Sequence, residues 1–305
     1  MIDVQRLRIL REVARHGSFS RAAAALLLTP SAVSQQIAAL ERTLGTPVVH
    51  RSTRGAVLTE PGRLLVEAAE TISAELRHTQ EQIDRFTTGR ATLTVATFTS
   101  GGRYLLPAAL ARFTADHPEV ELTVLEHEPE GSLPMIREGR ADIALAYHFD
   151  SPPPVRPGDR SRLTWTPLME DPMSVVVPAG HRLAGRASVD LAEIVAERWV
   201  LGCLKTGDFL HRYATLAGSE LRVSASTTDY FFAQVLVAAG VGIAMIPEVA
   251  LRPSAELVAV PVGPPRPARY IGVAVARRRL TRPHVAALAE ALRLAVPGGA
   301  VHCGG

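Results

Sequence analysis

The sequence predicts a multidomain α+β protein with a mostly helical N-terminal head, one long helix and an α/β body of two lobes. Three observations predict it. Capped amphipathic segments fill the first 60 residues, a heptad pattern continues to about residue 86, and strands then alternate with helices. A chain of 305 residues with 47% hydrophobic content is too long for a single DNA-binding module and can bury at least one full-sized core, so two or three domains are expected.

The central helix of the head is predicted to begin after Thr29 and to end at Gly45. The Thr29 hydroxyl can cap the first turn, and Pro30 stands where a missing N–H has no cost. One apolar face is formed by Val33, Ile37, Leu40 and Leu44. The other side carries short polar residues that suit base edges and phosphates, namely Ser31, Ser34, Gln35 and Arg42. This pattern indicates a recognition helix.

Two more helices and a β-hairpin complete the predicted head. An alanine-dense helix over 21–27, with Ser20 as its expected cap, precedes the recognition helix by only a few residues, as in a helix-turn-helix. A further helix is predicted over 4–16. After the recognition helix, two short apolar segments flank a turn that contains Arg51 and Arg54. The turn is interpreted as a basic wing.

The head resembles the N-terminal domain of LysR-type transcriptional regulators. The resemblance rests on the run 14–44, the Leu44-Gly45 step, and then Arg51, Arg54, Leu58-Thr59 and Gly62. The chain departs from the family at Val48-Val49, where a bulky Leu-Phe pair is usual, and at Pro61. The first change is expected to loosen the packing of the wing, and the second is tolerated in a first helical turn. DNA contacts are expected from Thr29, Pro30, Ser31, Ser34, Gln35, Arg42, Arg51 and Arg54.

The charge distribution is typical of a DNA-binding head on a neutral body. The net charge is +3, but residues 1–60 hold eight arginines against four acids, so the head carries +4 and the rest is nearly neutral. There is no apolar run of transmembrane length and no secretory signal, which predicts a cytoplasmic protein without membrane contact. Two cysteines, Cys203 and Cys303, predict neither a disulfide framework nor a metal site, and no cofactor is expected.

A linker helix is predicted over 61–88. Its seam alternates spacings of four and three through Leu65, Ala69, Ile72, Leu76, Thr79, Ile83 and Phe86. A helix of this length is too long for one small domain to cover, so the seam is expected to pair with a second copy. Packing on its own chain alone is the alternative. The resemblance implies a homodimer or homotetramer assembled through this helix and the effector domain.

The body, over 89–297, is predicted to hold parallel strands in two lobes, and a flexible tail is expected over 298–305. Lobe I takes about 89–165 and 268–297, lobe II about 166–267, with a Pro-rich connection over 151–162. The resemblance implies an effector domain similar to periplasmic solute-binding proteins, with a cleft between the lobes.

Candidate effector contacts lie where strands end and helices begin, because free amides there favour anions. They are Thr99, Ser100, Glu128, His148, Lys205 and Thr227. Each also has an ordinary interpretation: capping for the hydroxyls, a solvated loop for Glu128, packing for His148 and an unpaired surface charge for Lys205.

The predicted function is therefore a sequence-specific, DNA-binding transcriptional regulator whose promoter binding is modulated by a small-molecule effector. Two alternatives remain open: a solute-binding protein with a fused helical domain, and an enzyme that uses the cleft. The sequence contains no nucleophile elbow, phosphate loop, metal-spaced histidines or glycine fingerprint, so it is not expected to be an enzyme.

Overall fold

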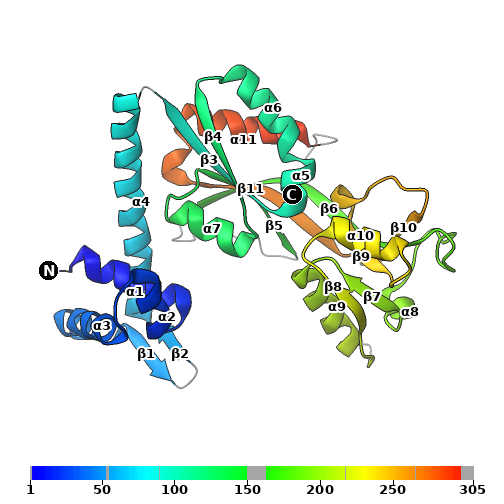
Figure 1. Cartoon of the computed structure of the whole chain (residues 1–305), viewed down its shortest axis with the longest axis horizontal. Helices are drawn as coiled ribbons and strands as arrows, with labels where there is room; N and C mark the ends of the chain where they lie inside the picture. The colour runs from blue at the N-terminus through cyan, green and yellow to red at the C-terminus, as the bar shows by residue number, and fades with distance from the viewer. Residues whose placement is uncertain are drawn as a thin grey trace. The chain divides into compact units, whose positions relative to one another are not determined.

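The computed structural model describes residues 2–52, 55–88, 90–149, 163–216, 218–264 and 266–296. The chain forms two compact units, residues 1–90 with 137–140, and residues 91–136 with 141–305 (Figure 1). The predicted Pro-rich connection, the predicted tail and Arg54 lie outside the described residues. No single helix in the described ranges is long and apolar enough to cross a membrane.

The head contains three helices and a two-stranded wing. They are α1 (Val4–His16), α2 (Phe19–Leu26), α3 (Pro30–Leu44), β1 (Val49–Ser52) and the antiparallel β2 (Gly55–Leu58). The predicted apolar face of α3 forms the centre of the core, since Val33, Ile37 and Leu40 are all fully buried. The spacing of these residues therefore determines which side of α3 remains available to a partner.

The ends of α3 are as predicted. The Thr29 hydroxyl accepts a hydrogen bond from the Ala32 amide at 3.2 Å, Pro30 is the first helical residue, and Gly45 ends the helix with a φ of 69°. The predicted cap of α2 is wrong. Ser18 takes this role and accepts from the Arg21 amide at 3.4 Å, because the helix already includes Ser20.

The wing is not loosened by its valine pair. Val48 and Val49 are buried in the head core, contrary to the expectation from their small size. Their amides donate to the Glu41 carboxylate at 2.9 and 3.3 Å, which ties the start of the wing to α3. A Cβ at Gly62 would lie 2.0 Å from the Val48 carbonyl oxygen, so only glycine allows the next helix to start this close.

The long helix α4 (Glu60–Thr88) agrees closely with the predicted linker helix. Its first turns pack on the head through Leu65 and Val66. Further along the seam, the exposed fraction reaches 62% at Leu76 and 50% at Ile83. Part of the heptad seam thus packs within its own chain, and part presents apolar side chains to solvent.

The second unit is organised on one sheet in the order β10-β6-β11-β5-β3-β4, with β9 also paired to β6. The strands of lobe I are β3 (Ala91–Thr97), β4 (Val120–Glu126), β5 (Ile143–Phe149), the first part of β6 (Leu163–Pro178) and β11 (Ala268–Ala276). β3 is parallel to β4 and β5, whereas β11 is antiparallel to β5 and β6. The sheet of lobe I is therefore mixed, and the predicted parallel arrangement holds only for β3, β4 and β5, because the chain leaves lobe I along β6 and returns along β11.

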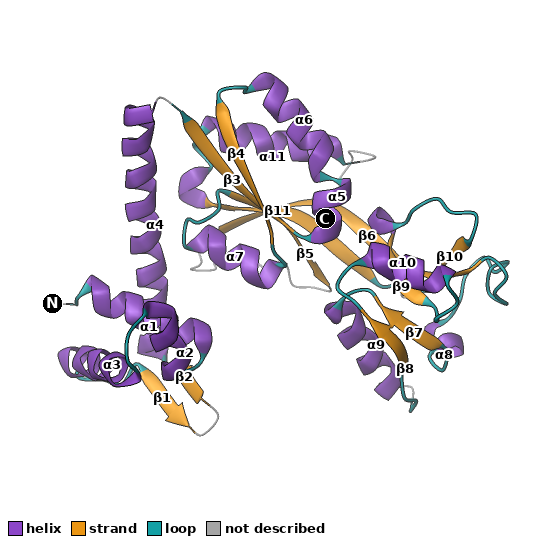
Figure 2. Ribbon diagram, in the orientation of Figure 1, coloured by secondary structure: helices purple, strands orange, loops and turns teal. Residues whose placement is uncertain are grey.

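Helices cover both faces of the lobe I sheet (Figure 2). α6 (Leu106–Asp116) and α11 (Pro283–Ala295) pack on bulky residues such as Leu145, whereas α7 (Pro129–Arg137) packs on small residues such as Ala144 and Ala146. Successive side chains of a strand point to opposite faces, so this alternation of size assigns each helix its side. The short α5 (Thr99–Tyr104) follows β3.

Lobe II combines the second part of β6 with two smaller layers. β9 (Ala244–Pro247) and β10 (Leu257–Pro261) flank β6, and β7 (Arg198–Leu201) pairs in parallel with β8 (Arg222–Ser226). Its helices are α8 (Leu191–Ile194), α9 (Leu204–Leu216), α10 (Tyr230–Ala238) and the 3-10 helix η1 (Glu248–Ala250).

A buried carboxylate anchors the end of lobe I. Asp142 forms ion pairs with Arg279, which lies in the 3-10 helix η2 (Arg277–Arg279), and with Arg282 at 2.7 Å. Its other oxygen accepts from the Thr94 amide at 2.8 Å. Asp142 and Arg279 are almost fully buried, so the pair joins the strands to the segment that starts α11.

Replacing Asp142 with Ala is therefore expected to reduce the free energy of unfolding by about 3–5 kcal/mol, because it removes the carboxylate that pairs with the buried Arg279 guanidinium. Urea unfolding followed by circular dichroism measures the loss. Glu290→Ala, which removes the solvent-exposed partner of Arg293, is the matched control and should change the midpoint very little. Equal changes in the free energy of unfolding for the two substitutions would contradict a stabilising role of the buried Asp142 ion pair.

Candidate functional site

The first candidate site is the polar side of α3. Ser31 and Gln35 are exposed, Ser34 is half-buried, and Arg42 is exposed near the end of the helix. The hydroxyls of Ser31 and Thr29 lie 3.0 Å apart. Short polar side chains on an exposed helix allow close approach to base edges and phosphates.

One neighbouring amide on the same helix is already engaged. Gln36 accepts from the Arg6 guanidinium at 3.3 Å, which joins α3 to α1. Gln35, the predicted base contact, is exposed next to it. The Arg51 side chain and all of Arg54 lie outside what the structure describes.

The second candidate site lies between the lobes and is centred on Arg269, whose side chain is 1% exposed. Its guanidinium donates to the Asp171 carboxylate at 2.9 and 2.7 Å and to the Ser100 hydroxyl at 3.0 Å. Asp171 also accepts from the Val249 amide of lobe II at 2.9 Å. We call the side chains around Arg269 the interlobe cluster: Ser100, Glu128, Tyr147, Asp171, Cys203, Lys205, Tyr230 and Arg269.

Aromatic rings enclose the guanidinium. Its carbon lies 5.1 Å from the centre of the Phe98 ring, 4.8 Å from Tyr147 and 5.6 Å from Tyr230. Phe98 and Tyr147 come from lobe I and Tyr230 from lobe II, so both lobes contribute to the enclosure. Arginine over an aromatic face is a favourable contact that becomes stronger when water is excluded.

Tyr147 connects Arg269 to the loops that were predicted from the sequence. Its hydroxyl donates to Glu128 at 2.7 Å and lies 3.7 Å from the Cys203 sulfur. The Lys205 ammonium lies 4.6 Å from the centre of the Tyr147 ring and pairs with Glu130 at 2.7 Å. One ring thus contacts groups of both lobes.

Burial determines the protonation of this cluster. Burial raises the pKa of the Tyr147 hydroxyl, and Cys203 and Glu128 raise it further, while burial likewise raises the pKa of Tyr230. Burial alone would lower the pKa of Arg269, but the Asp171 carboxylate raises it above its ordinary value. The tyrosine hydroxyls are therefore neutral beside a charged guanidinium.

Three of the six predicted effector residues meet in the cluster: Ser100, Glu128 and Lys205. The other three do not. The Thr99 hydroxyl donates to Glu126 at 2.9 Å, and the Thr227 hydroxyl accepts from the Asp229 amide at 3.1 Å. His148 stacks on Tyr270 at 5.3 Å, because it follows Tyr147 on β5 and points to the opposite face.

Four members of the cluster were not predicted from the sequence, namely Tyr147, Asp171, Tyr230 and Arg269, and Cys203 was not placed at this site. Asp171 and Arg269 lie 98 residues apart in the chain, so no local spacing relates them. The sequence contained only a weaker signal for these two residues than a motif would give. Both are charged residues next to an apolar strand segment, where a buried charge must find a partner.

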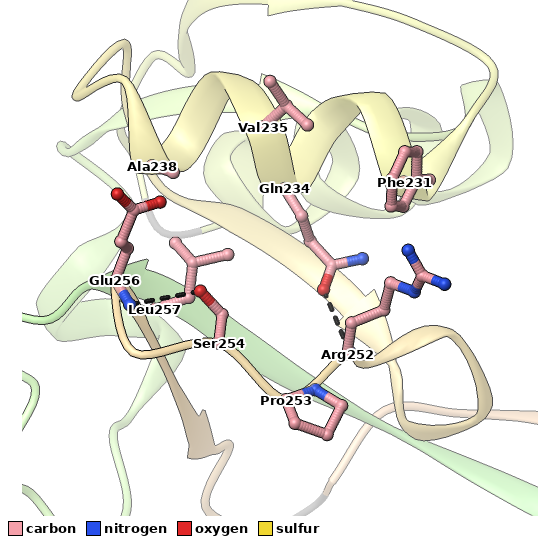
Figure 3. A pocket seen from close by; sticks show the side chains of 9 residues that line it. All are labelled: Phe231, Gln234, Val235, Ala238, Arg252, Pro253, Ser254, Glu256 and Leu257. Carbon is pink, nitrogen blue, oxygen red and sulfur yellow. Dashed lines mark hydrogen bonds between the residues drawn. The ribbon is translucent and has the colours of Figure 1, made fainter.

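A separate hollow of about 200 Å3 lies in lobe II, between α10 and the segment before β10 (Figure 3). Its lining includes Phe231, Val235, Pro253 and Leu257, with Arg252 at one side. The Arg252 amide donates to the Gln234 side chain at 3.2 Å, which holds this segment against α10. Its lining mixes apolar side chains with Gln234, Arg252, Ser254 and Glu256, and none of the predicted effector residues lines it.

Comparison with known families decides the identity. Residues 87–296 match the family described as LysR substrate binding domain, and residues 4–63 match the bacterial regulatory helix-turn-helix proteins of the lysR family. The chain belongs to the LysR family. The predicted family and fold class are thereby confirmed.

Individual LysR-type proteins cover nearly the whole chain. A probable hydrogen peroxide-inducible genes activator of Mycobacterium avium is 30% identical over 88% of this chain and 86% of its own length. A probable regulator named LrrA from Synechococcus elongatus is 29% identical over 97% and 98%. A full-length OxyR variant from Pseudomonas aeruginosa shares the fold, with a TM-score of 0.57 at 22% identity over 96% of this chain and 98% of that one.

As a LysR-type regulator, the protein is a DNA-binding transcription regulator with an effector-binding domain. The relatives are named as regulators rather than enzymes. The regulator function predicted from the sequence is confirmed.

The raised pKa values of Tyr147 and Tyr230 lead to a prediction at alkaline pH. At about pH 11, above the ordinary tyrosine pKa of about 10, both hydroxyls should stay protonated in the folded protein and ionise on unfolding. The folded state then binds more protons than the unfolded state, so stability should fall as pH rises above about 10. Tyrosinate absorbance measured before and after denaturation tests this. Tyr147→Phe should reduce the increase on unfolding by about one tyrosine, and complete ionisation in the folded protein would contradict the prediction.

Proposed function

We propose that the protein recognises promoter DNA through α3 and the wing, and that a small polar effector bound in the interlobe cluster modulates this recognition. The observation that carries the proposal is the contrast between the two sides of α3. Val33, Ile37 and Leu40 hold the helix in the head core, while Ser31 and Gln35 are exposed. A helix fixed in this way can enter a major groove without rearrangement.

Each predicted DNA contact of the head has a proposed role. Ser31, Ser34 and Gln35 read base edges, because hydroxyl and amide groups match the donor and acceptor pattern of the major groove. Arg42, Arg51 and Arg54 contact phosphates or the minor groove. Thr29 and Pro30 fix the first turn and bring it close to the backbone.

In the body, Ser100, Glu128 and Lys205 are the proposed effector contacts, together with Tyr147 and Arg269. Ser100 and Arg269 come from lobe I and Lys205 from lobe II, so a bound molecule would touch both lobes. We propose structural roles for Thr99, Thr227 and His148. The two threonines form hydrogen bonds within the chain, and His148 stacks on Tyr270 on the opposite face of β5 from Tyr147. An effector acts only if it binds one arrangement of the lobes better than another.

We propose that this cluster binds its ligand without turnover and that the protein acts in the cytoplasm, where the DNA is. The proposed division assigns 1–60 to the DNA-binding domain, 61–88 to the linker helix and 89–297 to the effector-binding domain, followed by a short tail. The buried Arg269 is already paired with Asp171, which supports a binding role more than an acid–base role.

Titration of labelled promoter DNA with the protein tests the proposed roles of Gln35 and Arg42. Gln35→Ala is expected to weaken binding to the native fragment by about 1–3 kcal/mol and to reduce discrimination against scrambled DNA. Arg42→Ala should weaken both fragments equally and reduce the slope of log affinity against log salt by about 1. Fluorescence anisotropy over a salt series gives both quantities.

Arg293→Ala on α11 is the control for a general loss of positive charge, because its pair with Glu290 is exposed on the other unit. It should leave binding unchanged. Equal weakening of native and scrambled DNA by Gln35→Ala would contradict base recognition by α3.

We further propose that the exposed part of the α4 seam pairs with a second copy. Leu76 and Ile83 are seven residues apart, one heptad, and both are largely exposed. The double substitution Leu76→Glu and Ile83→Glu should shift the protein towards smaller species in sedimentation velocity, because charges at seam positions oppose pairing. Arg77→Glu, one residue off the seam, is the matched control. An unchanged oligomer in the double variant would contradict the proposal.

A further inference from the structure

Three side chains that can bind a metal ion meet on the outer side of lobe I. His117 directly follows α6, Glu119 precedes β4, and His284 lies in the first turn of α11. Their ligand atoms all lie within 4.8 Å of one another. The sequence predicted no metal site, because His284 is far from the other two along the chain.

The local structure holds this group in place. The rings of His117 and His284 meet edge to face with centres 5.2 Å apart, and His117 Nδ1 lies 3.7 Å from the Glu119 carboxylate. The His117 ring also packs on Phe113, which is buried in the lobe I core. The backbone on either side is fixed by bonds from the His117 amide to Phe113 at 2.9 Å and from the Val120 amide to His117 at 3.2 Å.

The donor set selects a class of ion. Two imidazoles and one carboxylate suit Zn2+ and similar first-row ions, which bind these ligands at about 2.0–2.2 Å and leave a fourth position for water. Calcium and magnesium prefer sites built of oxygen. Tetrahedral coordination needs ligand atoms about 3.4 Å apart, so separations of up to 4.8 Å must shorten by up to about 1.4 Å. His117 and His284 are half-exposed and Glu119 is exposed, which leaves room for that rotation.

We propose that His117, Glu119 and His284 bind one Zn2+-type ion, which clamps the end of α6 to the start of α11. These helices belong to the two separate chain segments that together form lobe I. An ion that binds only the folded form stabilises it, so the clamp makes the stability of lobe I dependent on metal. The site is distinct from the proposed effector contacts, since it shares no residue with the interlobe cluster.

The test uses the full-length chain without a polyhistidine tag. Isothermal titration with Zn2+ should give one ion per chain with a Kd of about 10 μM or lower, and the thermal midpoint should rise in excess Zn2+. Co2+ should give the strong visible absorption of a four-coordinate ion. His117→Ala and His284→Ala should each weaken binding at least about 10-fold and abolish the thermal shift, with Glu119→Gln intermediate.

His211→Ala is the matched control, because His211 is an exposed helical histidine of lobe II. It should bind like the unaltered protein. The proposal is overturned if the His117 and His284 variants bind Zn2+ as the unaltered chain does, or if bound Co2+ shows only the weak spectrum of a six-coordinate ion. Circular dichroism of each apo variant shows that lost binding does not come from unfolding.

Discussion

The ion pair between Asp171 and Arg269 determines how the two lobes of this regulator meet. Asp171 is near the point where β6 leaves lobe I, and Arg269 stands just after the chain returns. Two residues further along, on the lobe II side, the Met173 amide donates to the Pro267 carbonyl at 2.8 Å. The two segments that connect the lobes therefore lie side by side. Buried charges are stable only when they are paired and hydrogen-bonded. The Val249 amide of lobe II donates a further hydrogen bond to the Asp171 carboxylate. The junction therefore depends on groups from both lobes.

This arrangement constrains any effector. A ligand that binds Arg269 through Nε or Nη2 must replace the Ser100 hydroxyl or share these donors with Asp171, because both atoms already bond these partners. Either change alters a bond at the crossing between the lobes, whereas contact with the half-exposed Lys205 alone does not. A ligand shifts the equilibrium between two lobe arrangements only if it makes different contacts in each. Ligands that bond Arg269 should therefore shift it more than ligands that contact Lys205 alone.

Local signals predicted the head well and the effector domain only in part. The Thr29 cap, the Gly45 stop and the period of α3 act over a few residues, so the sequence contains them directly. The antiparallel β11 depends on where the chain crosses between lobes, which no local pattern records. In the interlobe cluster, the predicted residue was His148, whereas the residue that takes part is its neighbour Tyr147. Adjacent residues of a strand point to opposite faces of the sheet, so an error of one residue selects the wrong side.

Tyr147 shows how the cluster can be closed and still respond to a ligand. Its hydroxyl donates to Glu128 of lobe I, while Cys203 and Lys205 of lobe II lie against the hydroxyl and the ring. A buried hydroxyl without a hydrogen-bond partner costs about 1–3 kcal/mol, but the bond to Glu128 lies within one lobe and does not depend on closure. Separation of the lobes therefore removes the Cys203 and Lys205 contacts from Tyr147 and leaves the bond to Glu128, and the hydroxyl oxygen can then accept a bond from water or from a polar effector. At this ring the lobes are joined by contacts that a ligand is chemically able to replace, as an effector-responsive domain requires.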